Sequence, residues 1–265
     1  MTDGHEGRVL PLEAIFNFRD YGGYPAGEGA RVKRATLWRS GQHNRATEAD
    51  LAEVSRLGLN TVIDLRGDSE RTMYPCVRPA DFVAAVLFEP GETAALKRVA
   101  AHEEASGALG SAEDARRAMV ELYRGLPWRP VLAGTLRLYF EALAERDGPS
   151  LLHCLAGKDR TGVATALAHH VLGVHPDDAL GDYLLTNSAG NLDQWIAMQS
   201  AAMRQRVGRE MSDAAIRVIL TVRPEYLETA LGAIRERHGS IDRYLEDVLG
   251  VTAERRQAIR ARLLE

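Results

Sequence analysis

Residues 151–162, LLHCLAGKDRTG, contain a cysteine and an arginine separated by five residues, and this spacing can hold a phosphate group. Leu151 and Leu152 are typical of the end of a buried strand, which would place Cys154 at the carboxyl edge of a sheet, where α/β proteins bind ligands. Apolar residues recur at helical spacing after Arg160, which indicates a helix. We therefore expect a loop between a strand and a helix, with a thiol at its floor.

The backbone of this loop is expected to bind an anion. Its N–H groups would turn inward and form a nest, and the following helix adds free N–H groups and the positive end of its dipole. Ala156 and Gly157 are small enough for a ligand to approach the backbone closely. The predicted phosphate-binding residues are Leu155, Ala156, Gly157, Lys158, Asp159, Arg160 and Thr161.

The polar side chains of the loop suggest a reaction. Cys154 is the predicted nucleophile, because a helix N-terminus and a cation favour its thiolate form. Arg160 can grip two phosphate oxygens with its planar guanidinium, and Asp159 is the nearest acid for the leaving oxygen. Lys158 adds positive charge at the rim for further phosphates, and Thr161 could hydrogen-bond the sulfur. Together they predict hydrolysis of a phosphate monoester through a cysteinyl-phosphate intermediate.

Other interpretations of the segment are weaker. A nucleotide-binding P-loop would need Ser or Thr where Asp159 stands, and an upstream glycine that is missing. Cys154 alone could be a buried strand residue, but the full pattern argues against that. An inactive phosphate-binding module is disfavoured because every residue needed for turnover is present. A thiol oxidoreductase is disfavoured because the loop has no second cysteine.

At these residues the sequence resembles the bacterial tyrosine phosphatases related to the secreted mycobacterial tyrosine phosphatase B, which are similar to lipid-directed phosphatases. Cys154, Arg160 and Thr161 match the general cysteine-phosphatase pattern, and residues 156–159 match the subfamily's Ala-Gly-Lys-Asp. Further blocks match in order at residues 17–23, 37–41 and 62–66, and residues 239–250 resemble the family's C-terminal helix. Residues 90–127 match poorly.

The resemblance implies a protein tyrosine phosphatase-like fold and a set of roles. Cys154 would be the nucleophile, Arg160 the phosphate clamp and Asp159 the acid, since the Trp-Pro-Asp loop of the larger tyrosine phosphatases is missing. Asp64 and Arg66 would lie near the pocket wall. Phosphotyrosine in proteins is the default substrate, with phosphoserine and phosphothreonine as additions. Phosphoinositides are the alternative, which Lys158 favours.

Two supporting residues are open to more than one interpretation. His153 could orient the loop by hydrogen bonding or could merely fill space. Asp64 could act at the pocket, where it is the next candidate for the acid after Asp159, or it could be a satisfied strand-end carboxylate.

Alternation of strands and helices predicts an α/β fold with a small, mostly parallel central sheet flanked by helices. Strands are expected at residues 14–18, 35–39, 61–65, 82–88 and 150–154. Thr47 is expected to cap a helix that ends near residue 57, and Pro224, Gly239 and Ser240 delimit later helices. Residues 90–127 would form two charged helices, as a lid or as a plain surface insertion. Residues 176–265 would be a helical packing region of one phosphatase domain, 1–265.

Composition sets limits on partners and location. The 265 residues are 45% apolar and 26% charged, with a net charge of −4, which argues against a nucleic-acid partner. No stretch is apolar enough for a signal peptide or a membrane span. The two cysteines, Cys76 and Cys154, form neither a disulfide framework nor the spacing of a metal-binding motif, so we expect neither metal nor cofactor. A reduced thiol fits the cytoplasm, although export without a recognisable signal would leave no trace here.

Overall fold

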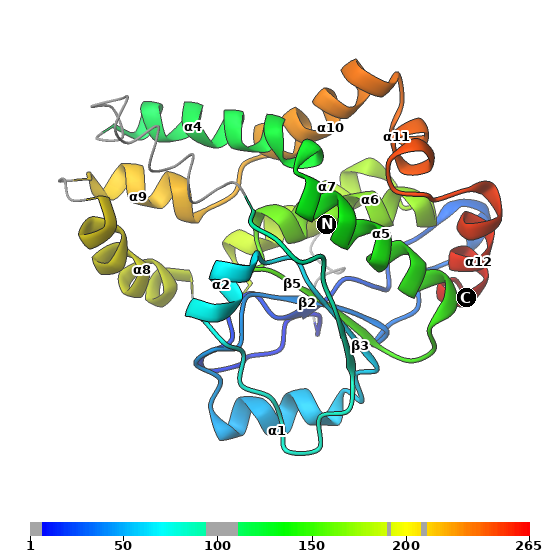
Figure 1. The fold of residues 1–265 in the computed structure, drawn as a ribbon, viewed down its shortest axis with the longest axis horizontal. Coiled ribbons are helices and arrows are strands. Elements are labelled where there is room, and N and C mark those ends of the chain that lie inside the picture. Colours follow the sequence, from blue (N-terminus) through cyan, green and yellow to red (C-terminus); the bar gives the residue numbers. More distant parts are fainter. Residues whose placement is uncertain (1–6, 94–110, 190–191, 208–210) are drawn as a thin grey trace.

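A five-stranded sheet forms the centre of the protein, as seen in a computed structural model that describes residues 7–93, 111–189, 192–207 and 211–265. The strands run in the order β1-β2-β5-β3-β4, and only β1 is antiparallel to its neighbour. Their bounds are Arg19–Asp20 (β1), Leu37–Ser40 (β2), Thr61–Asp64 (β3), Ala85–Leu87 (β4) and Ser150–His153 (β5). The predicted α/β fold with a mostly parallel sheet is confirmed (Figure 1).

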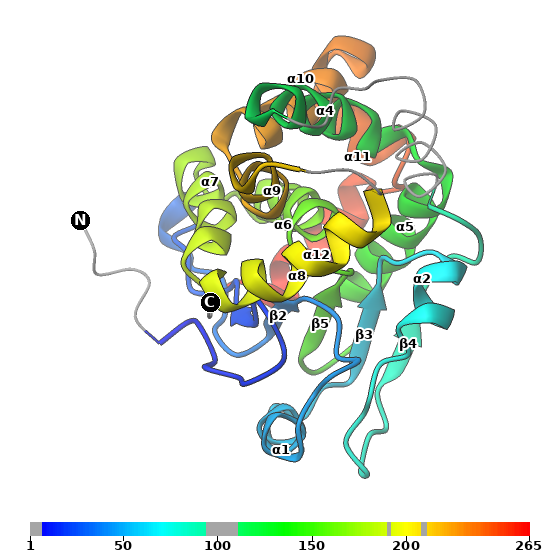
Figure 2. The ribbon, with the colours of Figure 1, turned by 90° about the vertical axis from the view of Figure 1, so that its left-hand side faces the viewer.

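Helices cover both faces of the sheet (Figures 1 and 2). Alternate strand residues point to opposite faces, so Trp38, Val62 and Leu151 join a buried cluster with Val54 of α1 (Glu48–Arg56). Their chain neighbours Leu37, Ile63 and Leu152 belong to the larger cluster, with side chains of α5 (Pro130–Glu145) and α6 (Asp159–Leu172). Thr47 caps α1 as predicted.

The C-terminal half is helical, as expected. After α6 come α7 (Pro176–Leu184), α8 (Leu192–Val207), α9 (Asp213–Leu220), α10 (Pro224–His238), α11 (Ile241–Asp247) and α12 (Ala253–Leu263). Short 3-10 turns occupy Gly27–Gly29, Leu126–Trp128 and Leu185–Asn187. Pro224 opens α10, Gly239 ends it with a φ of 80°, and Ser240 caps α11.

One helix of the predicted 90–127 region is described, α4 (Ala112–Gly125). It buries Ala115, Met119 and Tyr123, which lie on one face at intervals of four residues. This face packs against α9 and α10. The first of the two predicted helices lies almost entirely within residues 94–110, outside the described residues.

One local prediction was wrong and one element was missed. Residues 14–18 form a turn and not a strand, because Asn17 adopts a left-handed φ of 61° and breaks the extended run before β1. The short helix α2 (Asp68–Met73) was not predicted, since six residues carry too little periodicity to be recognised.

Candidate active site

The loop between β5 and α6 lies at the carboxyl end of the middle strand. Cys154 follows β5 directly and is almost fully buried, with 2% of its surface exposed. The Gly41 N–H donates to Phe16 O at 2.8 Å and the Gln42 N–H donates to Leu155 O at 3.0 Å, so the segment after β2 lies along the loop. The strand-loop-helix arrangement predicted around Cys154 is present.

Gly157 makes the tightest backbone contact of the loop. Its φ is 64°, and a Cβ placed on it would lie 2.3 Å from the carbonyl carbon and oxygen of Ser40. Only glycine can hold this position, because any side chain would collide with backbone. The loop is therefore pressed directly onto the end of β2.

Two side chains from the N-terminal part of the chain hold the Gly157 carbonyl. Asn17 Nδ2 donates to Gly157 O at 2.7 Å, and Arg39 Nη2 donates to it at 3.0 Å. The left-handed turn at Asn17 brings its amide to the loop. Both residues belong to sequence blocks that matched the family, but their contacts with the β5–α6 loop could not be predicted from the sequence.

A buried cluster of charges lies behind this support. Arg39 Nη1 lies 2.6 Å from Asp182 Oδ2, and Arg19 Nε lies 3.3 Å from Asp182 Oδ1, with all three side chains fully buried. Burial and the charge of Arg39 lower the pKa of Arg19 to about 10. Burial opposes ionisation of Asp182, but the two guanidinium groups outweigh it and lower the pKa of that carboxyl. Asp182, on α7, carried no sequence signal.

Arg160 is oriented by Glu70, a residue of α2 that sequence analysis missed. Its Nη1 lies 2.6 Å from Glu70 Oε2 and its Nη2 lies 2.7 Å from Oε1, while Nη1 also donates to Leu65 O at 3.1 Å. These contacts use three of the five guanidinium N–H groups. Among the described residues nothing accepts from the Nε edge, which leaves Nε and one Nη2 proton as a fork for two phosphate oxygens.

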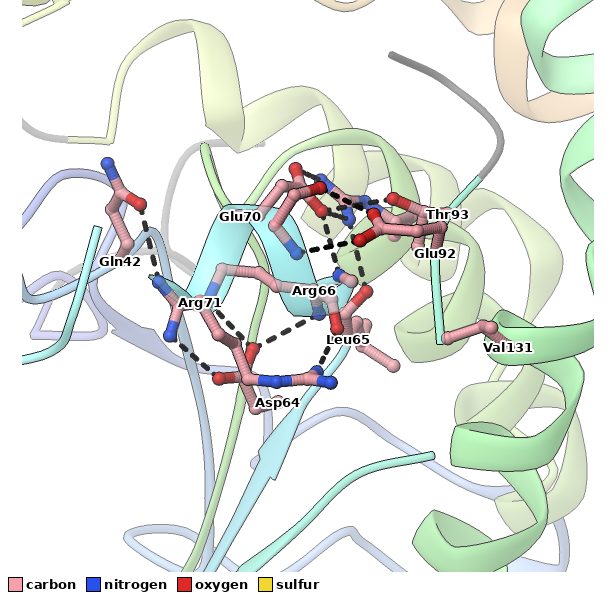
Figure 3. Close-up of polar contacts among 12 residues, drawn as sticks. Gln42, Asp64, Leu65, Arg66, Glu70, Arg71, Glu92, Thr93 and Val131 are labelled. Atoms are coloured by element: carbon pink, nitrogen blue, oxygen red, sulfur yellow. Dashed lines mark hydrogen bonds and ion pairs between the residues drawn. The ribbon is translucent and has the colours of Figure 1, made fainter. Parts of the chain in front are cut away.

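Glu70 is itself held in place. The Gly67 N–H donates to Glu70 Oε2 at 2.9 Å and Thr93 Oγ1 donates to the same oxygen at 3.1 Å. Figure 3 shows Glu70, Glu92 and Thr93 gathered at one side of α2. Burial would raise the pKa of Glu70, but Arg160 and these hydrogen bonds lower it. The bond from the Gly67 N–H to Glu70 is the return half of a capping box, in which a glutamate at the third helical position accepts from the N-cap backbone. A glycine followed three residues later by a glutamate was the weak signal available for α2.

Asp64 and Arg66 pair with each other. Arg66 Nε and Nη2 donate to the two carboxylate oxygens of Asp64 at 2.8 and 2.7 Å, and Figure 3 shows the two side chains together. Burial opposes ionisation of Asp64, but His153 and Arg66 outweigh it and lower its pKa. A carboxylate in this state is a poor proton donor, and the contacts match those of a satisfied strand-end carboxylate.

His153 and Thr161 are buried beneath the loop. Burial lowers the pKa of His153 to about 4, and its Nε2 lies 3.8 Å from Asp64 Oδ2, which is longer than a hydrogen bond. Within the described ranges no partner is found for Thr161 Oγ1. The predicted hydrogen bond from Thr161 to the cysteine sulfur is therefore not formed in this structure.

Lys158 and Asp159 face away from the sheet, toward the helical region. Lys158 is 3% exposed, and its Nζ lies 2.6 Å from Ile219 O, 3.3 Å from Thr221 O and 3.0 Å from Asp159 Oδ1. The ammonium thus donates to two carbonyls at the end of α9 and forms an ion pair with the Asp159 carboxylate. We expected Lys158 at an open rim, but in this structure it joins the loop to α9.

Among the described residues, neither a cluster of metal ligands nor a membrane-spanning helix is found. In the part of the chain that the structure describes, no three His, Cys, Asp or Glu side chains come together as metal ligands. The described helices include none that is long and apolar enough to cross a bilayer.

Comparison with known proteins agrees with this geometry. The sequence pattern of the tyrosine phosphatase family matches residues 10–265. A Cupriavidus necator protein named as a tyrosine-protein phosphatase is 32% identical over 246 residues, covering 91% of this chain and 84% of that protein. The triple specificity protein phosphatase PtpB of Mycobacterium tuberculosis is 31% identical over 265 residues, covering 90% of this chain and 93% of PtpB.

Proposed function

This chain belongs to the tyrosine phosphatase family and is a phosphatase, and on that premise we propose that it hydrolyses phosphoprotein monoesters through a covalent intermediate on Cys154. One observation carries the mechanism. Cys154 lies at the end of the central strand, and the guanidinium of the same loop keeps its Nε edge available for two phosphate oxygens.

The reaction has two steps. In the first, the Cys154 sulfur attacks phosphorus, the bond to the leaving oxygen breaks, and Asp159 supplies the proton that this oxygen needs. In the second, water attacks the cysteinyl phosphate, the sulfur leaves as thiolate and inorganic phosphate is released. Arg160 and the backbone N–H groups of the loop stabilise the charge on the equatorial oxygens in both transition states.

Phosphotyrosine is the proposed main substrate. The relative PtpB is named a triple specificity protein phosphatase, which makes phosphoserine and phosphothreonine worth testing as further substrates. The phosphoinositide alternative rested on Lys158, whose ammonium is bound within the protein by two carbonyls and one carboxylate. That ammonium would have to leave α9 before it could bind a second phosphate.

We also treat residues 1–265 as one phosphatase domain. The largest buried cluster contains Leu37 and Leu152 of the sheet together with Tyr226 and Ile259 of the C-terminal helices. The need for a reduced nucleophile favours a reducing compartment such as the cytoplasm.

Side-by-side kinetics on phosphotyrosine, phosphoserine and phosphothreonine peptides and on phosphoinositide vesicles test the proposal. Wild-type turnover of an aryl phosphate should persist in chelator and be blocked by vanadate, and a phosphorylated enzyme should be trapped by acid quench. Cys154→Ser should abolish turnover and trapping, whereas the matched change Cys76→Ser should preserve both. An active Cys154→Ser variant, or turnover lost in chelator, would contradict the mechanism.

A further inference from the structure

A chain of tyrosine hydroxyls reaches the catalytic loop from the helical region. Tyr123 of α4 is fully buried and donates from its hydroxyl to Asp159 Oδ1 at 2.6 Å. The same hydroxyl accepts a hydrogen bond of 2.7 Å from Tyr183 of α7. Hydrogen bonds therefore link α7 to α4 and α4 to one carboxylate oxygen of the loop.

The two oxygens of Asp159 are not equivalent. Tyr123 and the ammonium of Lys158, at 3.0 Å, both lie against Oδ1. Among the described residues no hydrogen bond falls on Oδ2. An oxygen that accepts the hydroxyl proton of Tyr123 and faces an ammonium has little capacity to carry a proton of its own, so protonation of this carboxyl places the proton on Oδ2.

We propose that Tyr123 is a positioning residue that holds Asp159 by Oδ1 and thereby presents Oδ2 as the proton donor to the leaving oxygen. The inference rests on the proposed function, in which Asp159 is the acid. Burial and the charge of Asp159 raise the pKa of Tyr123 well above its usual value, so its hydroxyl stays protonated and remains a donor. The amphipathic helix α4 thus contributes to catalysis through one hydroxyl.

The test is the dependence of turnover on the leaving group in Tyr123→Phe. For p-nitrophenyl phosphate, whose leaving group needs little protonation, kcat should fall by about threefold or less. For phenyl phosphate it should fall by roughly tenfold or more, because a misplaced acid slows the step that needs its proton. Urea unfolding of each variant confirms that the compared proteins are folded.

Tyr226 offers a matched control. Its ring lies 5.4 Å from that of Tyr123 and is equally buried, but its hydroxyl has no partner in the described part of the chain. Tyr226→Phe should keep the wild-type leaving-group dependence, and Tyr183→Phe should show a weaker form of the Tyr123→Phe effect. The proposal would be overturned if Tyr123→Phe lowered kcat equally on both esters. It would also be overturned if Tyr123→Phe showed the same leaving-group dependence as Tyr226→Phe.

Asp159→Asn distinguishes the acid role of Asp159 from the positioning role of Tyr123. It should show the steep leaving-group dependence in its full form, between about 100-fold and 10,000-fold for the poorer ester. If Asp159→Asn is steep and Tyr123→Phe is not, only the role of Tyr123 falls. If Asp159→Asn loses activity equally on both esters, the acid lies elsewhere, and the roles of Asp159 and Tyr123 are both contradicted, whereas hydrolysis through Cys154 is not.

Discussion

The carboxylate of Glu70 faces the guanidinium of Arg160 with both oxygens, at 2.6 and 2.7 Å. The pair is nearly buried, with side-chain exposures of 9% and 11%. Removing one partner of such a pair leaves an uncompensated charge in a poorly solvated place. The orientation of the Arg160 guanidinium therefore depends on a residue far from it in the sequence.

Glu70→Gln should lower kcat/KM by about tenfold or more, because the amide cannot accept from both guanidinium nitrogens and Arg160 loses its fixed orientation. Steady-state kinetics on phosphotyrosine peptides, with phosphate as a competitive inhibitor, would measure this change. Glu92→Gln is the matched control, since Glu92 binds the Ser69 backbone and hydroxyl on the same helix. Similar losses in both variants would argue against a specific role for Glu70.

Gly157→Ala should reduce activity by about 100-fold or more, because the added Cβ would displace the loop from the Ser40 carbonyl. It should also destabilise the protein, since alanine is strained at a φ of 64°. Gly232→Ala is the control, as a Cβ there meets nothing within 4 Å in the middle of α10. That variant should retain activity and gain about 0.5–1 kcal/mol. An active Gly157→Ala enzyme would show that the loop tolerates another backbone conformation.

Lys158→Met should lower turnover of phosphotyrosine peptides and phosphoinositides by the same factor, since the ammonium is bound by the carbonyls of Ile219 and Thr221. The variant should also lose about 1–3 kcal/mol of unfolding free energy, because these carbonyls lose their donor. The measurements are parallel kinetics and urea denaturation. A larger loss on phosphoinositides would mean that Lys158 leaves α9 to bind lipid phosphates.

The free energy of unfolding should fall as the pH drops from about 6.5 toward 4. Burial lowers the pKa of His153 from 6.5 to about 4, so over this window the unfolded chain binds a proton that the folded protein excludes. The loss from this group is about 2 kcal/mol at pH 5. Urea denaturation between pH 7 and pH 5 measures it.

His153→Gln should flatten this dependence by that amount. Glu70 adds a second loss at lower pH. Its pKa is lowered in the folded state, so its stabilising contribution disappears as the pH falls below about 4.5. If the unfolding free energies of wild type and His153→Gln depended identically on pH, His153 would not be the source of the loss.

The loop between β5 and α6 and the sheet could be predicted from the sequence because their signals are local. Cys154, Gly157 and Arg160 lie within seven residues, and an apolar strand and a periodic helix flank them. The caps at Thr47 and Ser240 likewise depend on neighbours three residues away. Such features need no knowledge of which segments meet in space.

The supporting residues could not be predicted because their partners are distant in the chain. Glu70 is 90 residues from Arg160, and Asn17 is 140 residues from Gly157. A buried Asp182 between two arginines looks like any helical surface aspartate until the fold is known. The same applies to Lys158, where a lysine in a polar loop suggested an exposed charge and the C-terminal end of α9 supplied unexpected acceptors.

The dual grip on the Gly157 carbonyl by Asn17 and Arg39 bears on any attempt to transplant this chemistry. A ten-residue signature grafted onto a foreign scaffold would carry the thiol and the guanidinium. It would lack Asn17 and Arg39, the two donors that fix the backbone of the loop at Gly157. Protein engineers would need to import the β1-β2 portion and Asp182 as one unit, so that the portable module is a three-dimensional assembly and not a linear motif.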